Sequence, residues 1–342
     1  MHRVYYLDIL RLFATLAVIL LHVSILFARD GNICWYAGTM YSSLSRWCVP
    51  VFIMISGALF LQPEKVLSIR VLYSKYILRL LVALFSWQIF YTVVLDPLRP
   101  VIINILHGSA ITYSIGEMYP LKYHLWFLPM MIGGYICMPM LKMIATNKSI
   151  LLYYLLLWFI YSVYDSLHLI PSLQFDVFSC IADYLKIHMV YGYSGYFLLG
   201  YYFSTLQISR RQMWISVCMF ICVCCLTVLG VIRGYGNFAC EDLAPNIILM
   251  SCAVFVCLKY VFSLQHTPMH ALLYRAEQFS RSKLFGIYLV HPFVLAMFPF
   301  YHFYCGSVSF ILIPLLACLI FIISLYIIRF MQRIPYLRYI CS

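Results

Sequence analysis

Ten apolar runs, each long enough to approach or cross a lipid bilayer, constrain the fold of this chain more than any other feature. Hydrophobic residues make up 65% of the 342 residues and charged residues only 10%, against about 25% charged in an average soluble domain. The runs lie at 5–28, 44–62, 72–95, 123–144, 149–170, 187–206, 212–232, 244–263, 283–303 and 308–330. The sequence therefore predicts an all-α polytopic membrane protein with about ten transmembrane helices, forming a single integral-membrane domain over 1–342.

The charges between the runs predict how the chain is oriented. With the N-terminus in the cytoplasm, sixteen Lys and Arg residues fall on the inner side and six on the outer side, and Arg11 inside the first run completes the 23. This asymmetry satisfies the positive-inside rule, and ten spans then leave both termini cytoplasmic. The net charge of +12 is explained by the cytoplasmic loops, so we expect a lipid bilayer and no nucleic acid as partner. A shorter apolar segment at 99–112 is predicted to be interfacial or re-entrant.

The fourteen cysteines do not predict a metal site. The one C-x-x-C spacing, from Cys222 to Cys225, lies inside the apolar run 212–232, and the sequence contains no HExxH or glycine-rich phosphate loop. We interpret the cysteines in the apolar runs as small core residues. Cys34 and Cys240 fall in predicted outer loops, and the sequence leaves open whether they form a disulfide.

The first apolar run contains three residues that are costly in hydrocarbon, namely Asp8, Arg11 and His22. At about 100° and 1.5 Å per residue, Arg11 and His22 lie within about 20° of one direction and about 16 Å apart along a helix. Asp8, three residues before Arg11, is close enough to neutralise part of its charge. Arg11 as a snorkelling anchor and His22 as a packing residue are the ordinary alternatives. The shared stripe favours a functional role for both.

A second group of cations begins the third run, where Arg70, Lys75 and Arg79 follow one another in SIRVLYSKYILRLL. Anionic lipid headgroups would explain such a cluster without any ligand. The alternative is a phosphate-rich substrate from the cytosol, because Arg and Lys are suitable phosphate donors.

Other runs show features of a cavity within a helical bundle. The pair Ser56–Gly57 permits close approach of another helix or of a ligand, and Pro129 with Gly133–Gly134 predicts a kink. Tyr and Gly dominate 191–202, which fits either a polar cavity that binds a sugar or lipid headgroup or ordinary close helix packing.

A second imidazole is predicted near the middle of the membrane. His291 lies eight residues after Lys283 in the ninth run, and Pro292 is expected to break the helix beside it. No Asp or Glu is predicted deep in any other run, so a proton-relay pump lacks its usual groups. An imidazole acting as general base on a hydroxyl is the chemistry that these residues allow.

Five motifs in order resemble acyltransferase family 3: LDILRLFATLAVILLH, which contains an Arg-x10-His pair, then VFIMISG, HLWFL, GYFLLGYYF and FGIYLVHP. The resemblance extends from Tyr6 to about Pro299. It implies an O-acetyltransferase of the bacterial inner membrane that uses cytoplasmic acetyl-CoA as acyl donor. The implied acceptor is a hydroxyl of a surface polysaccharide or of its lipid-linked precursor. YHLWF and GYGNF are similar to the enterobacterial-common-antigen type.

The same resemblance assigns roles to individual residues. It implies that His22 is the catalytic imidazole, as base or as transient acyl carrier, that Arg11 is its companion, and that His291 positions or polarises. Arg79, with Lys75 and Arg11, would bind the donor phosphates. Family members often have an Arg-Arg pair and a Pro near this cluster, where this chain has Lys75 and a Leu-rich sequence. The competing class is a transporter or flippase for a lipid-linked sugar, which a ten-span bundle with a polar cavity also suits.

Overall fold

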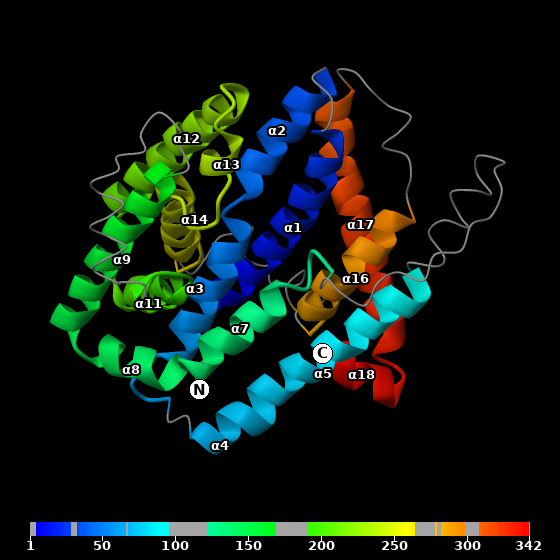
Figure 1. Ribbon diagram of the computed structural model, residues 1–342, viewed down its shortest axis with the longest axis horizontal. Coiled ribbons are helices and arrows are strands. Elements are labelled where there is room, and N and C mark those ends of the chain that lie inside the picture. Colours follow the sequence, from blue (N-terminus) through cyan, green and yellow to red (C-terminus); the bar gives the residue numbers. More distant parts are fainter. Residues whose placement is uncertain are drawn as a thin grey trace.

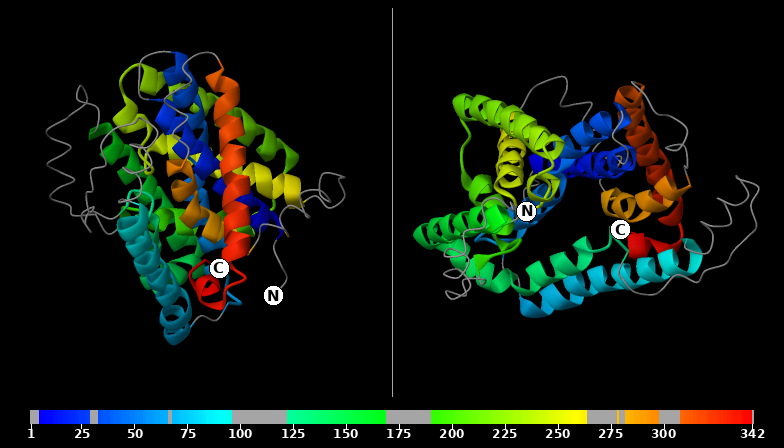
Figure 2. Two further views of the ribbon diagram at one scale, coloured as in Figure 1. Left: turned by 90° about the vertical axis from the view of Figure 1, so that its right-hand side faces the viewer. Right: turned by 45° about the horizontal axis from the view of Figure 1, so that its top comes forward.

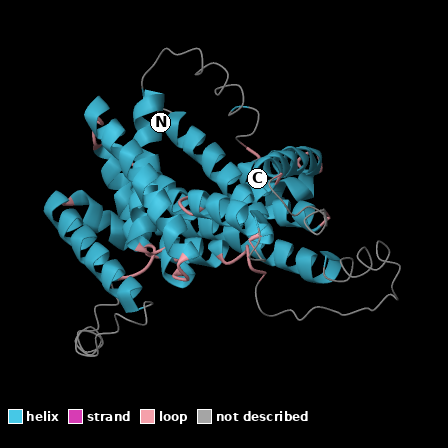
Figure 3. Cartoon of the chain, turned by 90° about the horizontal axis from the view of Figure 1, so that it is seen from above, coloured by secondary structure: helices cyan, strands magenta, loops and turns pink. Residues whose placement is uncertain are grey.

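All regular elements in the described part of the chain are helices (Figures 1 and 3). The computed structural model describes residues 5–28, 33–65, 68–95, 122–168, 190–263, 278, 282–297 and 308–341. With η marking π-helical turns, the elements are α1 (Tyr5–Phe27), α2 (Ile33–Ser45), α3 (Cys48–Phe60), α4 (Ile69–Val71), η1 (Leu72–Ile77), α5 (Leu78–Phe90), η2 (Tyr91–Leu95), α7 (Phe127–Ile136), α8 (Met138–Thr146), α9 (Lys148–His168), α11 (Ser194–Thr205), α12 (Arg210–Ile232), α13 (Gly236–Ala239), α14 (Pro245–Ser263), α16 (Leu284–Ala296), α17 (Ser309–Met331) and α18 (Pro335–Cys341).

Within the described ranges, seven helical stretches are long and apolar enough to cross a bilayer, and the bent pair α7 and α8 makes an eighth if it counts as one span. Each of the ten predicted runs contains a helix, but the sixth and ninth contain only α11 and α16, of 12 and 13 residues. The all-α membrane fold is thus confirmed. The number of spans and the side on which the termini lie stay predictions, and the segment 99–112 lies outside the described residues.

Helix α1 lies at the centre of the bundle and is buried along most of its length. Leu7, Ile9 and Leu10 on α1 join an apolar core with α3, α11 and α14, whereas Ile19 and Val23 join a second core with α5, α16 and α17. Figures 1 and 2 show these two groups of helices on opposite sides of α1. A helix that is apolar on all sides suits this position, because neighbours cover every face.

Helices α3 and α11 pack closely enough to require glycine. A Cβ atom on Gly57 would lie 1.8 Å from the Phe197 carbonyl oxygen, and one on Gly200 would lie 1.9 Å from the Met54 carbonyl oxygen. The predicted close approach of another helix is therefore found at Gly57. Lys259 closes the end of α11, because its ammonium donates to the carbonyl oxygens of Phe203 and Ser204, both at 2.8 Å.

The bend in the fourth run differs from the predicted one. α7 and α8 meet at 58° with the break at Cys137, two residues before Pro139 in the first turn of α8. Pro129 instead lies in the first turn of α7, where a backbone N–H is not needed for the helical ladder, so it causes no kink.

No disulfide joins Cys34 and Cys240. Cys34 also lies inside α2 and not in a loop, which corrects the sequence prediction. Its buried sulfur accepts a hydrogen bond from the Ser309 hydroxyl at 3.2 Å, a contact between α2 and α17.

Candidate active site

A cavity of about 380 Å³ lies between α1, α3, α5, α7 and α16, within the size range of small-molecule sites of about 300–1,000 Å³. Most of its wall is apolar or aromatic. The polar and charged side chains on the wall include Arg11, His22, Ser56, Arg79, His124 and Tyr288. Arg11, His22 and Arg79, three of the residues predicted from the sequence, thus share one cavity.

His22 on α1 and His291 on α16 form a direct hydrogen bond, with His22 Nδ1 2.7 Å from His291 Nε2. The two rings are within 5° of parallel and their centroids are 5.0 Å apart. For two imidazoles joined by a hydrogen bond of 2.7 Å, a centroid distance of 5.0 Å is the largest possible. The hydrogen bond therefore lies along the line that joins the two ring centres. The sequence predicted that His22 and His291 lie at similar depth in the membrane. The structure shows that they are in direct contact, although 269 positions separate them.

The surroundings of His291 determine which of its nitrogens holds the proton. Its Nδ1 lies 2.7 Å from the Tyr288 carbonyl oxygen and 3.3 Å from that of Ile287. Carbonyl oxygens only accept, so Nδ1 is the donor and, in the neutral ring, Nε2 is the acceptor. Pro292 makes the Tyr288 carbonyl available, because a residue with an N–H at position 292 would bond this oxygen in the helical ladder.

The tautomer of His22 follows from that of His291. Since His291 Nε2 accepts, His22 Nδ1 must donate, and the lone pair of the neutral His22 ring is then on Nε2. No hydrogen bond within the described ranges occupies this nitrogen, and His22 lines the cavity. The arrangement presents an unoccupied basic nitrogen to any ligand in the cavity. His291, itself held by the Tyr288 carbonyl, orients His22 as the carboxylate of a catalytic triad orients the triad histidine.

Pro292 does not end α16, which corrects the sequence prediction; the helix continues to Ala296. The Tyr91 hydroxyl bridges the ladder beside the proline, because it donates to the Leu289 carbonyl at 2.7 Å and accepts from the Phe293 N–H at 3.2 Å. These are the two groups that an unbroken helix would join directly. Tyr91 therefore satisfies the backbone of α16 next to His291.

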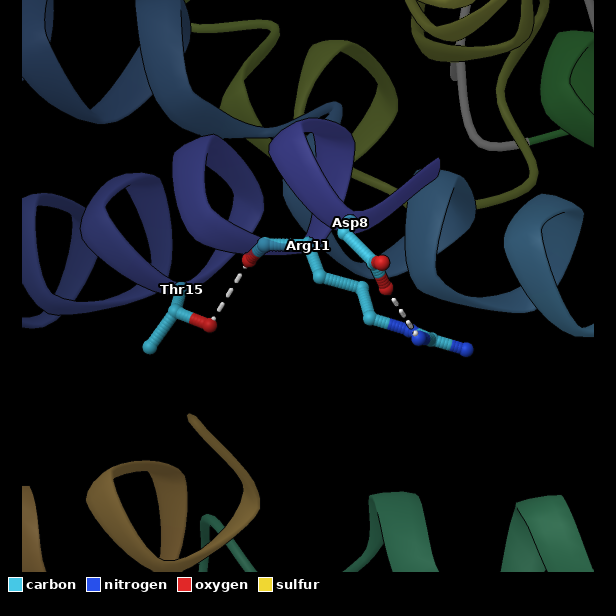
Figure 4. Close-up of polar contacts among 3 residues, drawn as sticks. All are labelled: Asp8, Arg11 and Thr15. Carbon is cyan, nitrogen blue, oxygen red and sulfur yellow. Dashed lines mark hydrogen bonds and ion pairs between the residues drawn. The ribbon is translucent and has the colours of Figure 1, made fainter. Parts of the chain in front are cut away.

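The end of the cavity away from the two histidines is positively charged. It contains Arg11 and Arg79, and we call it the cationic end. Arg11 donates to the Asp8 carboxylate at 2.9 Å, as its spacing predicted, and the Thr15 hydroxyl donates to the Arg11 carbonyl (Figure 4). The Arg11 side chain remains 37% exposed, so it stays accessible to a ligand. Arg79 lies with its guanidinium carbon 5.6 Å from the Phe285 ring centroid. Tyr135 lies in the same cavity wall as both arginines.

Lys75 is not brought into the cavity. It is exposed within the π-helical turn η1, with Nζ 5.9 Å from the Tyr76 ring centroid.

Lys65, which sequence reasoning missed, adds to the positive charge near the cationic end. It lies in the turn after α3, with Nζ 3.6 Å from the Phe60 ring centroid. Burial, together with the charges of Arg11, Lys142 and Lys75, lowers the pKa of Lys65 to about 8. A lysine that cannot easily keep its proton among other cations marks a site where an anion would be stabilised. Counting the charges in each loop could not identify Lys65 as a site residue, because its closeness to the other cations depends on the tertiary fold.

Aromatic and acidic side chains lie near the end of the cavity that is opposite to the cationic end. The Trp126 ring in the wall is 5.8 Å from that of Tyr193, whose hydroxyl lies 3.5 Å from Asp242 Oδ2. The Tyr191 hydroxyl donates to Asp165 at 2.5 Å. Burial raises the pKa of Asp242 to about 6, partly opposed by the Arg46 charge. The Tyr-rich segment thus combines hydroxyls with carboxylates, a set that can bind a ligand rich in hydroxyl groups.

The comparisons with known proteins agree with the architecture. A family model described as an acyltransferase domain matches residues 4–329. No curated protein and no solved structure matches the chain.

Replacing Pro292 tests the tautomer assignment. Pro292→Ala supplies an N–H that competes with His291 Nδ1 for the Tyr288 carbonyl, so we expect kcat to fall about tenfold or more, as for other supporting groups of catalytic side chains. The thermal midpoint should not fall, because a proline inside a helix costs about 3 kcal/mol relative to alanine. Turnover and thermal unfolding are measured on the same purified protein. Unchanged kcat with a higher midpoint would mean that Pro292 only shapes the helix.

Proposed function

Since this chain belongs to acyltransferase family 3, whose model matches nearly all of it, we propose that it is a membrane O-acetyltransferase. The donor would be cytoplasmic acetyl-CoA, and the acceptor a hydroxyl of a surface polysaccharide or of its lipid-linked precursor. The motifs YHLWF and GYGNF are similar to those of the enterobacterial-common-antigen type. The observation that supports the proposal best is the unoccupied Nε2 of His22 in a cavity that also contains a cationic end.

The cationic end suits the phosphates of the donor. Guanidinium groups bind phosphate through paired, charge-assisted hydrogen bonds, and Arg11 and Arg79 both line the cavity. Lys65 and the exposed Lys75 would contact those phosphates of the donor that remain outside the cavity. The acyl chain would then extend along α1 towards His22, a distance of about 16 Å from Arg11.

The aromatic and acidic end suits a carbohydrate acceptor. Trp126 is in the cavity wall, and Tyr193 with Asp242 lies directly behind it. Donor and acceptor would thus approach His22 from different ends. With the predicted orientation of the chain, the cationic end faces the cytoplasm, so acetyl-CoA need not cross the membrane.

In the proposed reaction, His22 Nε2 takes the proton of the acceptor hydroxyl as its oxygen attacks the thioester carbonyl carbon. The new C–O bond forms, the C–S bond breaks, and the leaving thiolate takes the proton from the imidazolium. The products are the acetyl ester and free CoA. His291 accepts from His22 Nδ1–H throughout, which keeps the ring oriented and stabilises the imidazolium.

Label transfer tests the function. Purified protein in vesicles is incubated with radiolabelled acetyl-CoA and a lipid-linked glycan fraction, and acetylated glycan is counted. His22→Gln keeps similar size and a hydrogen-bonding group, so the protein should fold, while transfer falls at least about 10²-fold, the lower range for general-base assistance. Near-wild-type transfer by His22→Gln would contradict the mechanism. Glycan that crosses the bilayer without label would favour a flippase.

Binding of acetyl-CoA tests the cationic end separately. Arg79→Ala should weaken binding about 10- to 100-fold, because a hydrogen bond to a charged group is worth about 1.5–3 kcal/mol. Calorimetry on folded protein measures the Kd. Arg210→Ala removes an exposed cation at the start of α12, outside the cavity lining, and should leave the Kd unchanged. A Kd for Arg79→Ala within twofold of wild type would make Arg79 a lipid anchor.

A further inference from the structure

We propose that His124 is a third catalytic side chain, which donates a hydrogen bond to the carbonyl oxygen of the acyl group as that oxygen becomes negatively charged. His124 lies in the turn before α7 and lines the same cavity as His22. Its side chain is only 3% exposed, and neither ring nitrogen has a hydrogen-bond partner. The inference rests on the proposed acyl transfer and adds to it the group that would stabilise the oxyanion.

An unpartnered buried imidazole is costly. Burying a donor or acceptor without a partner costs about 1–3 kcal/mol, and native proteins contain few such groups. Ser43, Ser162 and Ser324 have unpartnered buried hydroxyls as well, but they do not line this cavity. Among the described residues of the cavity wall, His124 alone combines burial with unpartnered side-chain nitrogens. Under 1 Å² of each His124 nitrogen is accessible, so a ligand in the cavity would provide the missing partner once the wall around the ring shifts.

The His124 ring is held in place without using its nitrogens. The Tyr91 ring packs against it edge to face with centroids 4.6 Å apart, and the His291 ring lies 6.4 Å away in the same arrangement. The His124 backbone carbonyl accepts a hydrogen bond from the Tyr288 hydroxyl. Tyr91 and Tyr288 also contact the backbone around His291, so the same residues position both histidines. A donor fixed in advance is what electrostatic stabilisation of a transition state requires.

The other nearby groups already have partners. His22 uses its N–H on His291, and His291 uses its own on the Tyr288 carbonyl. Arg11 lies about 16 Å from His22 along α1, which is too far for its guanidinium to reach the same carbonyl. A neutral imidazole has one N–H, so His124 can donate one hydrogen bond. In the transfer step this N–H would bond the thioester oxygen while the acceptor oxygen attacks, and the bond would relax when the C=O re-forms.

A binding experiment tests this contact without any turnover. The probe is the acetyl-CoA analogue in which a methylene group replaces the thioester sulfur, compared with CoA, which has no acyl carbonyl. Wild-type protein should bind the analogue about two- to tenfold more tightly than CoA, the range of one hydrogen bond. His124→Phe keeps an aromatic ring but has no donor and should lose this preference. Equal preference in His124→Phe and wild type would overturn the proposal for His124 and leave the proposed function intact. Failure of wild type to bind either compound would overturn the proposed function itself.

Kinetics provide the second readout. His124→Phe should lower kcat by about 10²–10³-fold, as for removal of one oxyanion donor, with little change in KM for acetyl-CoA. His124→Gln retains an N–H donor and should keep at least tenfold more activity than His124→Phe. Ser324→Ala serves as the control: it removes an unpartnered buried hydroxyl outside the cavity and should leave kcat unchanged. Equal losses in the Phe and Gln variants would mean that shape alone matters at this position.

Thermal unfolding separates catalysis from folding. Replacing an unpartnered buried polar group with an apolar one should leave the midpoint unchanged or raise it. A His124→Phe protein that unfolds would show that the ring supports the fold, and this result would overturn the proposal.

Discussion

The hydrogen bond between His22 and His291 is the interaction on which the rest of the site depends. It joins the first helix of the chain to α16 and gives each imidazole a defined tautomer. Without it, the lone pair of His22 could be on either nitrogen. The tautomer in turn depends on a backbone carbonyl that is available because Pro292 has no N–H. The proposed catalytic base is thus oriented without a buried carboxylate, which would be costly inside a membrane.

The cavity around this pair is asymmetric, and the asymmetry explains how one site could serve two very different substrates. Arg11 and Arg79 provide positive charge for phosphates at one end. Trp126, Tyr193 and Asp242 provide aromatic and hydrogen-bonding groups near the other. Because α1 extends between these ends, a single helix would determine how far the phosphates of the proposed donor lie from the reacting atoms.

What could be predicted from the sequence was local or periodic. Helix geometry sufficed for the Asp8–Arg11 contact and for the shared stripe of Arg11 and His22, because both depend on one helix. The contact of His22 with His291 was predicted only as a similarity in depth, since 269 residues separate them and helix packing decides their distance. His124 was missed for the same reason. The sequence shows His124 only as the first residue of the HLWFL motif, and the signal that identifies it as a site residue, an unpartnered buried ring, exists only in three dimensions.

The most direct test of this account is the protonation pattern of the His22 and His291 rings in the protein. Nitrogen and carbon chemical shifts of isotopically labelled histidine distinguish the two neutral tautomers, and His22→Gln and His291→Gln assign the two sets of signals among the ten histidines. The account predicts that both rings have their proton on Nδ1, so that Nε2 of His22 is free. A proton on His22 Nε2 would contradict it, because the nitrogen that faces the substrate could then not act as the base.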